Sequence, residues 1–242
     1  DATAVANAGN QSVGQLTAFN EKGILIHDCD FINKVALANL DIENSNYAIY
    51  TADAGFRVED CSFKGYKTGV STTTVTNSPA RSVKVMNNTF DSLGLGIMFS
   101  SNFGFAQGNN FDNLLSYTYD KNYVAYLHEG EAVYIDNASS ITVTTNTMNN
   151  SNNLPQRGIT SNNTRRFGAR IIDNTLNNIR LGTITQKNNP RLDILCNHYN
   201  DGFANVLVNP QSPNDYLKDQ GNGCNTWEYR AGNTFTSSTP YN

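Results

Sequence analysis

One stretch of the sequence decides the fold: GFRVEDCSFKGYKTGV at residues 55–70. Residues 23–37, GILIHDCDFINKVAL, begin in the same way, because apolar residues alternate with other residues before an Asp-Cys pair and a Phe. Short runs of alternating apolar residues are typical of β-strands. The two stretches therefore indicate a repeated unit that opens with a strand.

The opening of this unit recurs along most of the chain. Seven octets align, at residues 24–31, 56–63, 83–90, 104–111, 141–148, 169–176 and 192–199. The third place holds the apolar residues Ile26, Val58, Val85, Ala106, Val143, Ile171 and Ile194. The sixth place holds Cys29, Cys61, Asn88, Asn109, Asn146, Asn174 and Asn197. The eighth place holds Phe31, Phe63, Phe90, Phe111, Met148, Leu176 and Tyr199. A further copy survives in part as Asn233-Thr234-Phe235.

The variable length of the unit favours a β-solenoid. Successive octets start 32, 27, 21, 37, 28 and 23 residues apart, whereas helical repeats and propeller blades keep a stricter period. Coils of a solenoid stack about 4.8 Å apart, so that like side chains lie above one another and an Asn can bond the next Asn. The sequence therefore predicts an all-β parallel β-helix of about eight coils, with apolar third and eighth places and a buried Asn ladder.

Composition limits the class of protein. The 242 residues carry a net charge of −4 and include 37 Asn, and their length suits a single domain over 1–242. No stripe of Lys and Arg is available to neutralise phosphates, so we expect no nucleic-acid partner. No apolar run is long enough to span a membrane. The first residues carry no signal peptide, so we expect a mature chain or a piece of a longer one.

The repeated residues resemble the right-handed parallel β-helix of the pectin-lyase-like superfamily, over residues 20–208. The resemblance implies the fold but leaves the activity open. The superfamily includes polysaccharide lyases, glycoside hydrolases, epimerases, tailspikes and non-catalytic adhesins.

The end of the chain carries a narrower resemblance. Residues 194–210, ILCNHYNDGFANVLVNP, and 220–235, QGNGCNTWEYRAGNTF, are similar to the close of β-helix segments in large Bacteroidetes surface proteins exported by the type IX system. This resemblance implies a capping region over 209–242, a fragment of a longer chain, and a location outside a Gram-negative bacterium or on its surface. In an exported chain, Cys196 and Cys224 are then expected to form a disulfide that holds the cap.

The repeat is interrupted once, over residues 112–140, where Tyr residues lie among charged residues. Tyr rings can stack on sugars, and charged neighbours can bond hydroxyl or carboxylate groups. A glycan-binding site would use Tyr119, Tyr123 and Tyr126 for stacking, with Lys121, Glu129 and Arg157 as polar contacts. A lyase would use Lys121 or His128 as the base and Arg157 or Arg165 to neutralise a uronate carboxylate. The alternative is that these Tyr residues are simply strand formers and that the Arg residues lie in a solvated turn.

Other candidate sites are sparse. His27, His128 and His198 share no ligand spacing, so we expect them to be ordinary strand or surface residues. We expect no metal site and no cofactor; Ca²⁺ enters only if the chain is a lyase. Cys29 and Cys61 share the sixth place in successive coils and are expected to be stacked free thiols. Asp91-Ser92-Leu93 resembles the short Bacteroidetes O-glycosylation signal, which makes Ser92 a candidate modification site.

These observations favour a non-catalytic, secreted or cell-surface segment that acts as a stalk or adhesin and contacts glycans. Its partners would be cell-surface polysaccharides and other domains of a longer surface protein. The main alternative is a polysaccharide lyase or glycoside hydrolase with its site on a lateral face. A phage tailspike fragment is the second alternative.

Overall fold

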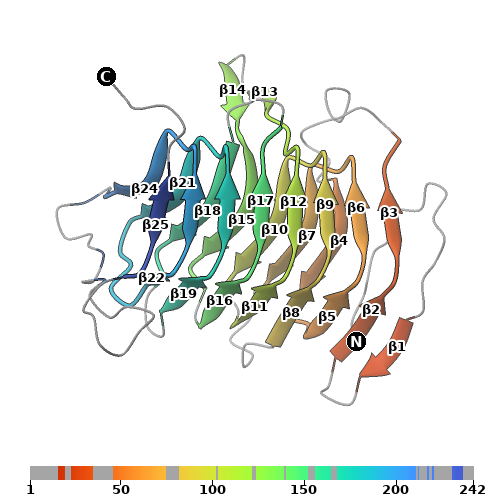
Figure 1. Ribbon diagram of the computed structural model, residues 1–242. Coiled ribbons are helices and arrows are strands. Elements are labelled where there is room, and N and C mark those ends of the chain that lie inside the picture. The colour runs from red at the N-terminus through yellow and green to blue at the C-terminus, as the bar shows by residue number, and fades with distance from the viewer. Residues whose placement is uncertain are drawn as a thin grey trace.

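The computed structural model describes residues 16–19, 23–34, 46–74, 82–101, 103–121, 124–138, 140–151, 156–164, 168–210, 212, 217, 220 and 231–236. For 16–19, 117–121 and 124–128 the description covers the backbone alone. Every regular element in these ranges is a strand, and the strands are stacked into an elongated solenoid (Figure 1).

Three stacked sheets form the walls of the solenoid. Sheet A contains β1 (Leu16–Phe19), β2 (Gly23–His27), β5 (Phe56–Glu59), β8 (Ser82–Met86), β11 (Phe103–Gln107), β16 (Ile141–Thr144), β19 (Ala169–Ile172) and β22 (Asp193–Leu195). Sheet B contains β3 (Asp30–Ile32), β6 (Ser62–Lys64), β9 (Thr89–Asp91), β12 (Asn110–Asp112), β17 (Thr147–Asn149), β20 (Thr175–Asn177), β23 (His198–Asn200) and β25 (Thr234–Thr236). Sheet C contains β4 (Tyr47–Ala52), β7 (Thr68–Thr73), β10 (Leu95–Ser100), β15 (Gly130–Asp136), β18 (Gln156–Asn162), β21 (Leu181–Gln186) and β24 (Ala204–Asn209).

The chain visits the sheets in a fixed order. From β2 to β24 it runs from sheet A to sheet B to sheet C and then returns to sheet A one position further along the stack. All pairings within the three sheets are parallel except that of β1, which lies antiparallel to β2. This connectivity is a parallel β-helix, as the repeat predicts.

The corner between sheets A and B explains the fifth place of the repeat. This place has a positive φ in each aligned unit, at Asp28, Asp60, Asn87, Gly108, Thr145, Asp173 and Cys196. Asp, Asn and Gly tolerate the left-handed region better than other residues, which accounts for most of these residue types. The turn directs the following side chain, at the sixth place, into the solenoid.

The sixth place forms the predicted ladder. Asn146 shows the pattern: its Oδ1 accepts from the backbone N–H of Asn109 at 3.0 Å and from Asn109 Nδ2 at 2.9 Å. Its own Nδ2 donates to Asn174 Oδ1 at 2.9 Å and to the Ala106 carbonyl at 3.0 Å. The same bonds link Asn88, Asn109, Asn146, Asn174, Asn197 and Asn233. The five Asn from 88 to 197 are at most 1% exposed, so the buried ladder is confirmed.

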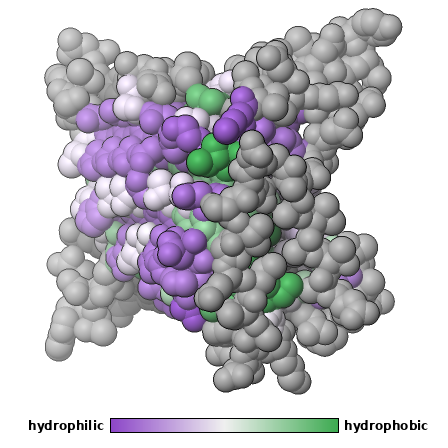
Figure 2. Space-filling view, turned by 90° about the vertical axis from the view of Figure 1, so that its right-hand side faces the viewer, coloured by the Kyte–Doolittle hydropathy of each residue, from purple (hydrophilic) through white to green (hydrophobic). Residues whose placement is uncertain are grey.

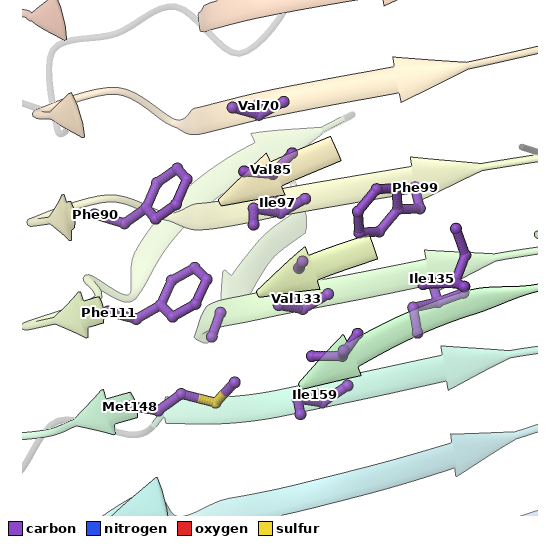
Figure 3. Close-up of a cluster of buried hydrophobic side chains, with 14 of the residues drawn as sticks. Val70, Val85, Phe90, Ile97, Phe99, Phe111, Val133, Ile135, Met148 and Ile159 are labelled. Atoms are coloured by element: carbon purple, nitrogen blue, oxygen red, sulfur yellow. The ribbon is translucent and has the colours of Figure 1, made fainter. Parts of the chain in front are cut away.

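The eighth place forms an apolar column beside the ladder. The rings of Phe31, Phe63, Phe90 and Phe111 stack with centroids 4.8–4.9 Å apart. Met148 follows in the same column, and Val70, Ile97, Val133 and Ile159 line the facing wall (Figure 3). Tyr199 stacks on Phe235, so the partial eighth copy continues this column. The prediction of an apolar core at the third and eighth places is confirmed.

The first two units replace the Asn amide with a thiol. Cys29 and Cys61 are buried and free, as predicted. The thiols donate to backbone carbonyls, Cys29 to His27 and Cys61 to Glu59. Burial raises the pKa of the Cys61 thiol to about 12, so this thiol is neutral and a poor nucleophile at physiological pH.

In the described part of the chain, no helix is long and apolar enough to cross a membrane. Figure 2 views the end of the molecule that carries β1, β2 and β3. Its coloured surface is mainly hydrophilic, with small apolar patches. This surface agrees with a composition in which only 38% of residues are hydrophobic.

Candidate functional site

An antiparallel hairpin interrupts the solenoid between sheets B and C. It consists of β13 (Tyr117–Lys121) and β14 (Val124–His128) and projects beyond the neighbouring strands (Figure 1). The predicted excursion, 112–140, is therefore too wide, because Gly130–Asp136 is an ordinary sheet C strand. Just before the hairpin, the Leu114 carbonyl accepts a hydrogen bond from Gln156 Nε2 at 2.7 Å, which ties this part of the chain to β18.

The backbone register of the hairpin positions several predicted residues. Tyr119 lies opposite Tyr126, and Lys121 lies opposite Val124. His128 lies opposite Tyr117, at the base of the hairpin. Tyr119 and Tyr126 thus lie across from each other in the middle of the hairpin, Lys121 lies toward its tip, and His128 lies next to the start of β15.

The strand after the hairpin carries charged and polar side chains on its outer side. Ala132, Val133 and Ile135 belong to the hydrophobic core. Because neighbouring residues of a strand point to opposite sides, Tyr134 faces outward between the core residues Val133 and Ile135. In the register of sheet C, Glu131 pairs with Arg157 on β18. We name Glu129, Glu131, Tyr134, Arg157 and Arg180 the outer cluster.

Glu129 holds the outer cluster together. Its Oε2 lies 2.7 Å from Arg157 Nε, and its Oε1 lies 2.5 Å from an Arg180 guanidinium nitrogen. The Glu129 side chain is 10% exposed, whereas those of Arg157 and Arg180 are 35% and 48% exposed. One nearly buried carboxylate thus positions two guanidinium groups that both reach the solvent.

Glu131 is the most unusual group of the cluster. It is 4% exposed, and its Oε1 has no hydrogen-bond partner. Burial raises the pKa of this carboxyl to about 7, and the nearby Glu129 charge adds to the rise. The Thr160 hydroxyl and the Arg157 charge lower the pKa but do not offset the burial. Glu131 therefore exchanges its proton close to neutral pH.

Tyr134 extends the cluster along β15. Asn162 Nδ2 donates to the Tyr134 hydroxyl at 3.2 Å and to Asp136 Oδ1 at 2.7 Å. Burial raises the pKa of the Tyr134 hydroxyl, and the Asp136 and Glu131 charges act in the same direction. Tyr134 therefore remains a neutral hydroxyl group that can donate or accept a hydrogen bond.

The outer cluster has the chemistry of a binding site for polar or anionic groups. With Glu131 protonated, two guanidinium charges face one carboxylate, which leaves one excess positive charge. Arg donors suit carboxylate and hydroxyl acceptors, because the planar guanidinium presents several N–H groups in a fixed fork. Glu131 itself is too deeply buried to contact a ligand in this conformation.

Sequence reasoning found part of this cluster. Of the predicted polar contacts, Glu129 and Arg157 do lie together. The side chains of Tyr119, Lys121, Tyr126 and His128, and all of Tyr123 and Arg165, lie outside the described residues.

Neither Arg180 nor Glu131 is among the residues predicted from the sequence. A coil-by-coil alignment of the sheet C strands could have found Arg180. It directly precedes Leu181, the register partner of Arg157.

The remaining predicted sites lie elsewhere. Cys196 is disulfide-bonded, and its expected partner, Cys224, lies outside the described residues. Ser92 follows β9 with a φ of 57°, and its hydroxyl donates to Asp91 Oδ1 at 3.0 Å. Glycosylation of this turn serine stays a prediction.

No family model, curated protein or solved structure matches the chain. The parallel β-helix assignment stands on the strand pairings, the register and the Asn ladder.

Proposed function

We propose that this chain is a glycan-binding segment of a secreted or cell-surface protein. It would be a right-handed parallel β-helix of the pectin-lyase-like kind, in a Bacteroidetes protein exported by the type IX system. The β-helix serves as a stalk or adhesin, and the outer cluster with the adjacent hairpin contacts the polysaccharide.

The observation that carries the proposal is the pairing of Glu129 with both Arg157 and Arg180. The carboxylate orients the two guanidinium groups, while each Arg side chain keeps a third or more of its surface exposed. Such pre-oriented donors bind at a low entropic cost. The two partly exposed guanidinium groups favour a glycan that carries carboxylate groups over a neutral one.

The hairpin supports the same site because it leads directly into β15, the strand that carries Glu131 and Tyr134. The register places Tyr119 opposite Tyr126. Cross-strand aromatic pairs provide flat apolar surfaces, and such surfaces suit the faces of sugar rings. A polysaccharide that stacks on the hairpin would reach the Arg groups at its base.

Electrophoresis in gels that contain a defined polysaccharide tests this proposal. We expect polygalacturonate to retard the chain more than a neutral glucan does, and we expect Arg157→Met and Arg180→Met to remove most of the retardation. Arg170→Met is the matched control, because Arg170 also faces an acidic partner, Asp193, at 3.9 Å, but on sheet A. The absence of retardation by either polymer, or an equal loss in Arg170→Met, would contradict the proposal.

A catalytic role is the second candidate, and Glu131 is the observation that favours it. A carboxyl with a pKa of about 7 beside an ion-paired carboxylate is the arrangement that acid–base catalysis uses. The burial of Glu131 argues against direct contact with a substrate. Release of unsaturated or reducing sugars from polygalacturonate during the same incubations would favour the enzyme over the stalk.

A further inference from the structure

A second group of polar side chains lies on sheet A, remote in sequence from the outer cluster. It consists of His27, at the end of β2, and Glu59 and Asp60, at the end of β5. One ligand atom from each of these three side chains lies within 4.8 Å of the other two. We propose that this group binds a divalent transition-metal ion of the Zn²⁺ type.

The donor set suits such an ion. One imidazole nitrogen and two carboxylate oxygens are ligands that Zn²⁺ accepts, whereas Ca²⁺ requires six to eight oxygen ligands. The two carboxylates also supply the negative charge that a dication requires. A site with three protein ligands leaves a fourth position for water.

The distances fit a shared ion. His27 Nδ1 lies 3.3 Å from Asp60 Oδ2 and 3.7 Å from Glu59 Oε1. Two ligands about 2.1 Å from a tetrahedral ion are separated by about 3.4 Å. The His27 and Asp60 side chains are about half exposed, so small rotations can close the remaining gap around an ion.

The backbone holds the ligands in place. His27 and Glu59 are register partners on adjacent parallel strands, and the Asp28 N–H donates to the Glu59 carbonyl at 3.2 Å. The Asp60 N–H donates to the Met86 carbonyl at 3.2 Å, which fixes the turn that carries the third ligand. The three ligands are therefore placed by strand stacking rather than by a free loop.

Arg57 orients the Glu59 carboxylate. Its guanidinium contacts Glu59 Oε2, which directs Oε1 toward His27. Outer-shell groups of this kind tune metal sites, and their loss typically weakens metal binding 10-fold to 100-fold.

The repeat shows that two of these ligands, His27 and Glu59, are not part of the scaffold pattern. His27 and Glu59 occupy the fourth place of their octets. In the other units this place holds Met86, Gln107, Thr144, Ile172 and Leu195. The two N-terminal units thus depart from the apolar or neutral residues that this outer row carries elsewhere.

Calorimetric titration of the tag-free, full-length chain with ZnCl₂ tests the proposal. We expect one equivalent of Zn²⁺ to bind, and His27→Gln, Glu59→Gln and Asp60→Asn each to weaken binding by at least about 10-fold. His198→Gln is the matched control, because His198 bonds Thr234 on sheet B and should leave the affinity unchanged. CaCl₂ should bind more weakly than ZnCl₂.

A second measurement does not depend on variants. The His27 ring resonances should shift on addition of Zn²⁺ in NMR spectra, while the His198 resonances stay in place. Absence of Zn²⁺ binding at millimolar concentration, or equal binding by His27→Gln, would overturn the proposal. In that case the group would only be a set of polar contacts between the His27 ring and two carboxylates.

Discussion

Two polar regions of this solenoid differ in how their buried groups are satisfied. In the corner ladder, Asn109, Asn146 and Asn174 repeat the same residue, and each amide bonds the next. In the outer cluster the stacked coils supply Glu and Arg rather than one repeated residue, and Glu131 keeps an oxygen with no partner. Repetition along the stack gives every buried polar group an identical neighbour, whereas broken repetition leaves groups that can respond to protons or ligands.

The difference distinguishes scaffold from candidate site. A repeated Asn is explained entirely by its neighbours above and below. Glu129, Arg157 and Arg180 have no counterparts in the other coils, so stacking cannot explain them. The same contrast applies on sheet A, where His27 and Glu59 stand out from their row.

The largest effect should come from breaking the ladder. Asn146→Leu removes the acceptor of two Asn109 donors and the donor to the Ala106 carbonyl, all of them buried. Unsatisfied buried groups cost about 1–3 kcal/mol each, so we expect a loss of about 4 kcal/mol in the free energy of unfolding.

Denaturation in guanidinium chloride measures this change. Thr142→Leu is the control, because Thr142 is half-buried on β16, outside the ladder. A loss below about 1 kcal/mol for Asn146→Leu would mean that the ladder contributes little beyond ordinary packing.

Glu131 should give a pH-dependent effect of intermediate size. Its pKa rises from an ordinary 4.5 to about 7 in the folded state, so the folded protein prefers the protonated form. The resulting stability is fully present below pH 4.5 and is lost as the pH rises through 7. The shift corresponds to a contribution of about 3 kcal/mol.

The variant Glu131→Gln isolates this contribution, because Gln has a similar shape and does not titrate. We expect the variant to gain stability relative to the wild type between pH 5 and pH 8. The difference between the two unfolding free energies at each pH removes the titration of all other groups. Parallel pH profiles would show that Glu131 does not change protonation on folding.

The smallest effect on stability should come from Arg180, the most exposed Arg of the outer cluster. Arg180→Met removes one ion pair from Glu129, but that carboxylate keeps Arg157. The Arg180 side chain is about half exposed and screened by water, so we expect a loss of about 0.5 kcal/mol or less. Thermal unfolding with and without 0.5 M salt measures it. A loss above 1 kcal/mol would place Arg180 among the structural groups of the solenoid.

The sequence predicts the ladder and the core because both repeat. Seven copies of the octet show which residues share a row. A row that is apolar or Asn in nearly every copy must point into the solenoid. The positive φ at Asp60 or Asn87 follows from the same alignment, since these residue types tolerate that conformation.

The outer cluster could not be predicted in the same way. Arg180 meets Glu129 across two coils, and that contact depends on how much of the intervening chain forms the hairpin. The burial of Glu131 depends on the groups that cover β15, which a repeat alignment does not contain. The group at His27 was overlooked because its ligands come from adjacent coils, 32 and 33 residues apart in sequence.

The ladder also has a direction, since each amide oxygen accepts from the unit before it. The amide ladder ends at Cys61, whose backbone N–H donates to Asn88 Oδ1. The Cys61 side chain is a thiol, so it cannot continue the amide-to-amide bonds toward Cys29. A solenoid behaves as a one-dimensional lattice, in which each rung is stabilised by its nearest neighbours alone. The rung at Cys29 therefore has the weakest coupling in the row. Opening of the ladder should therefore be easier at its thiol end than at the consecutive rungs from Asn88 to Asn197.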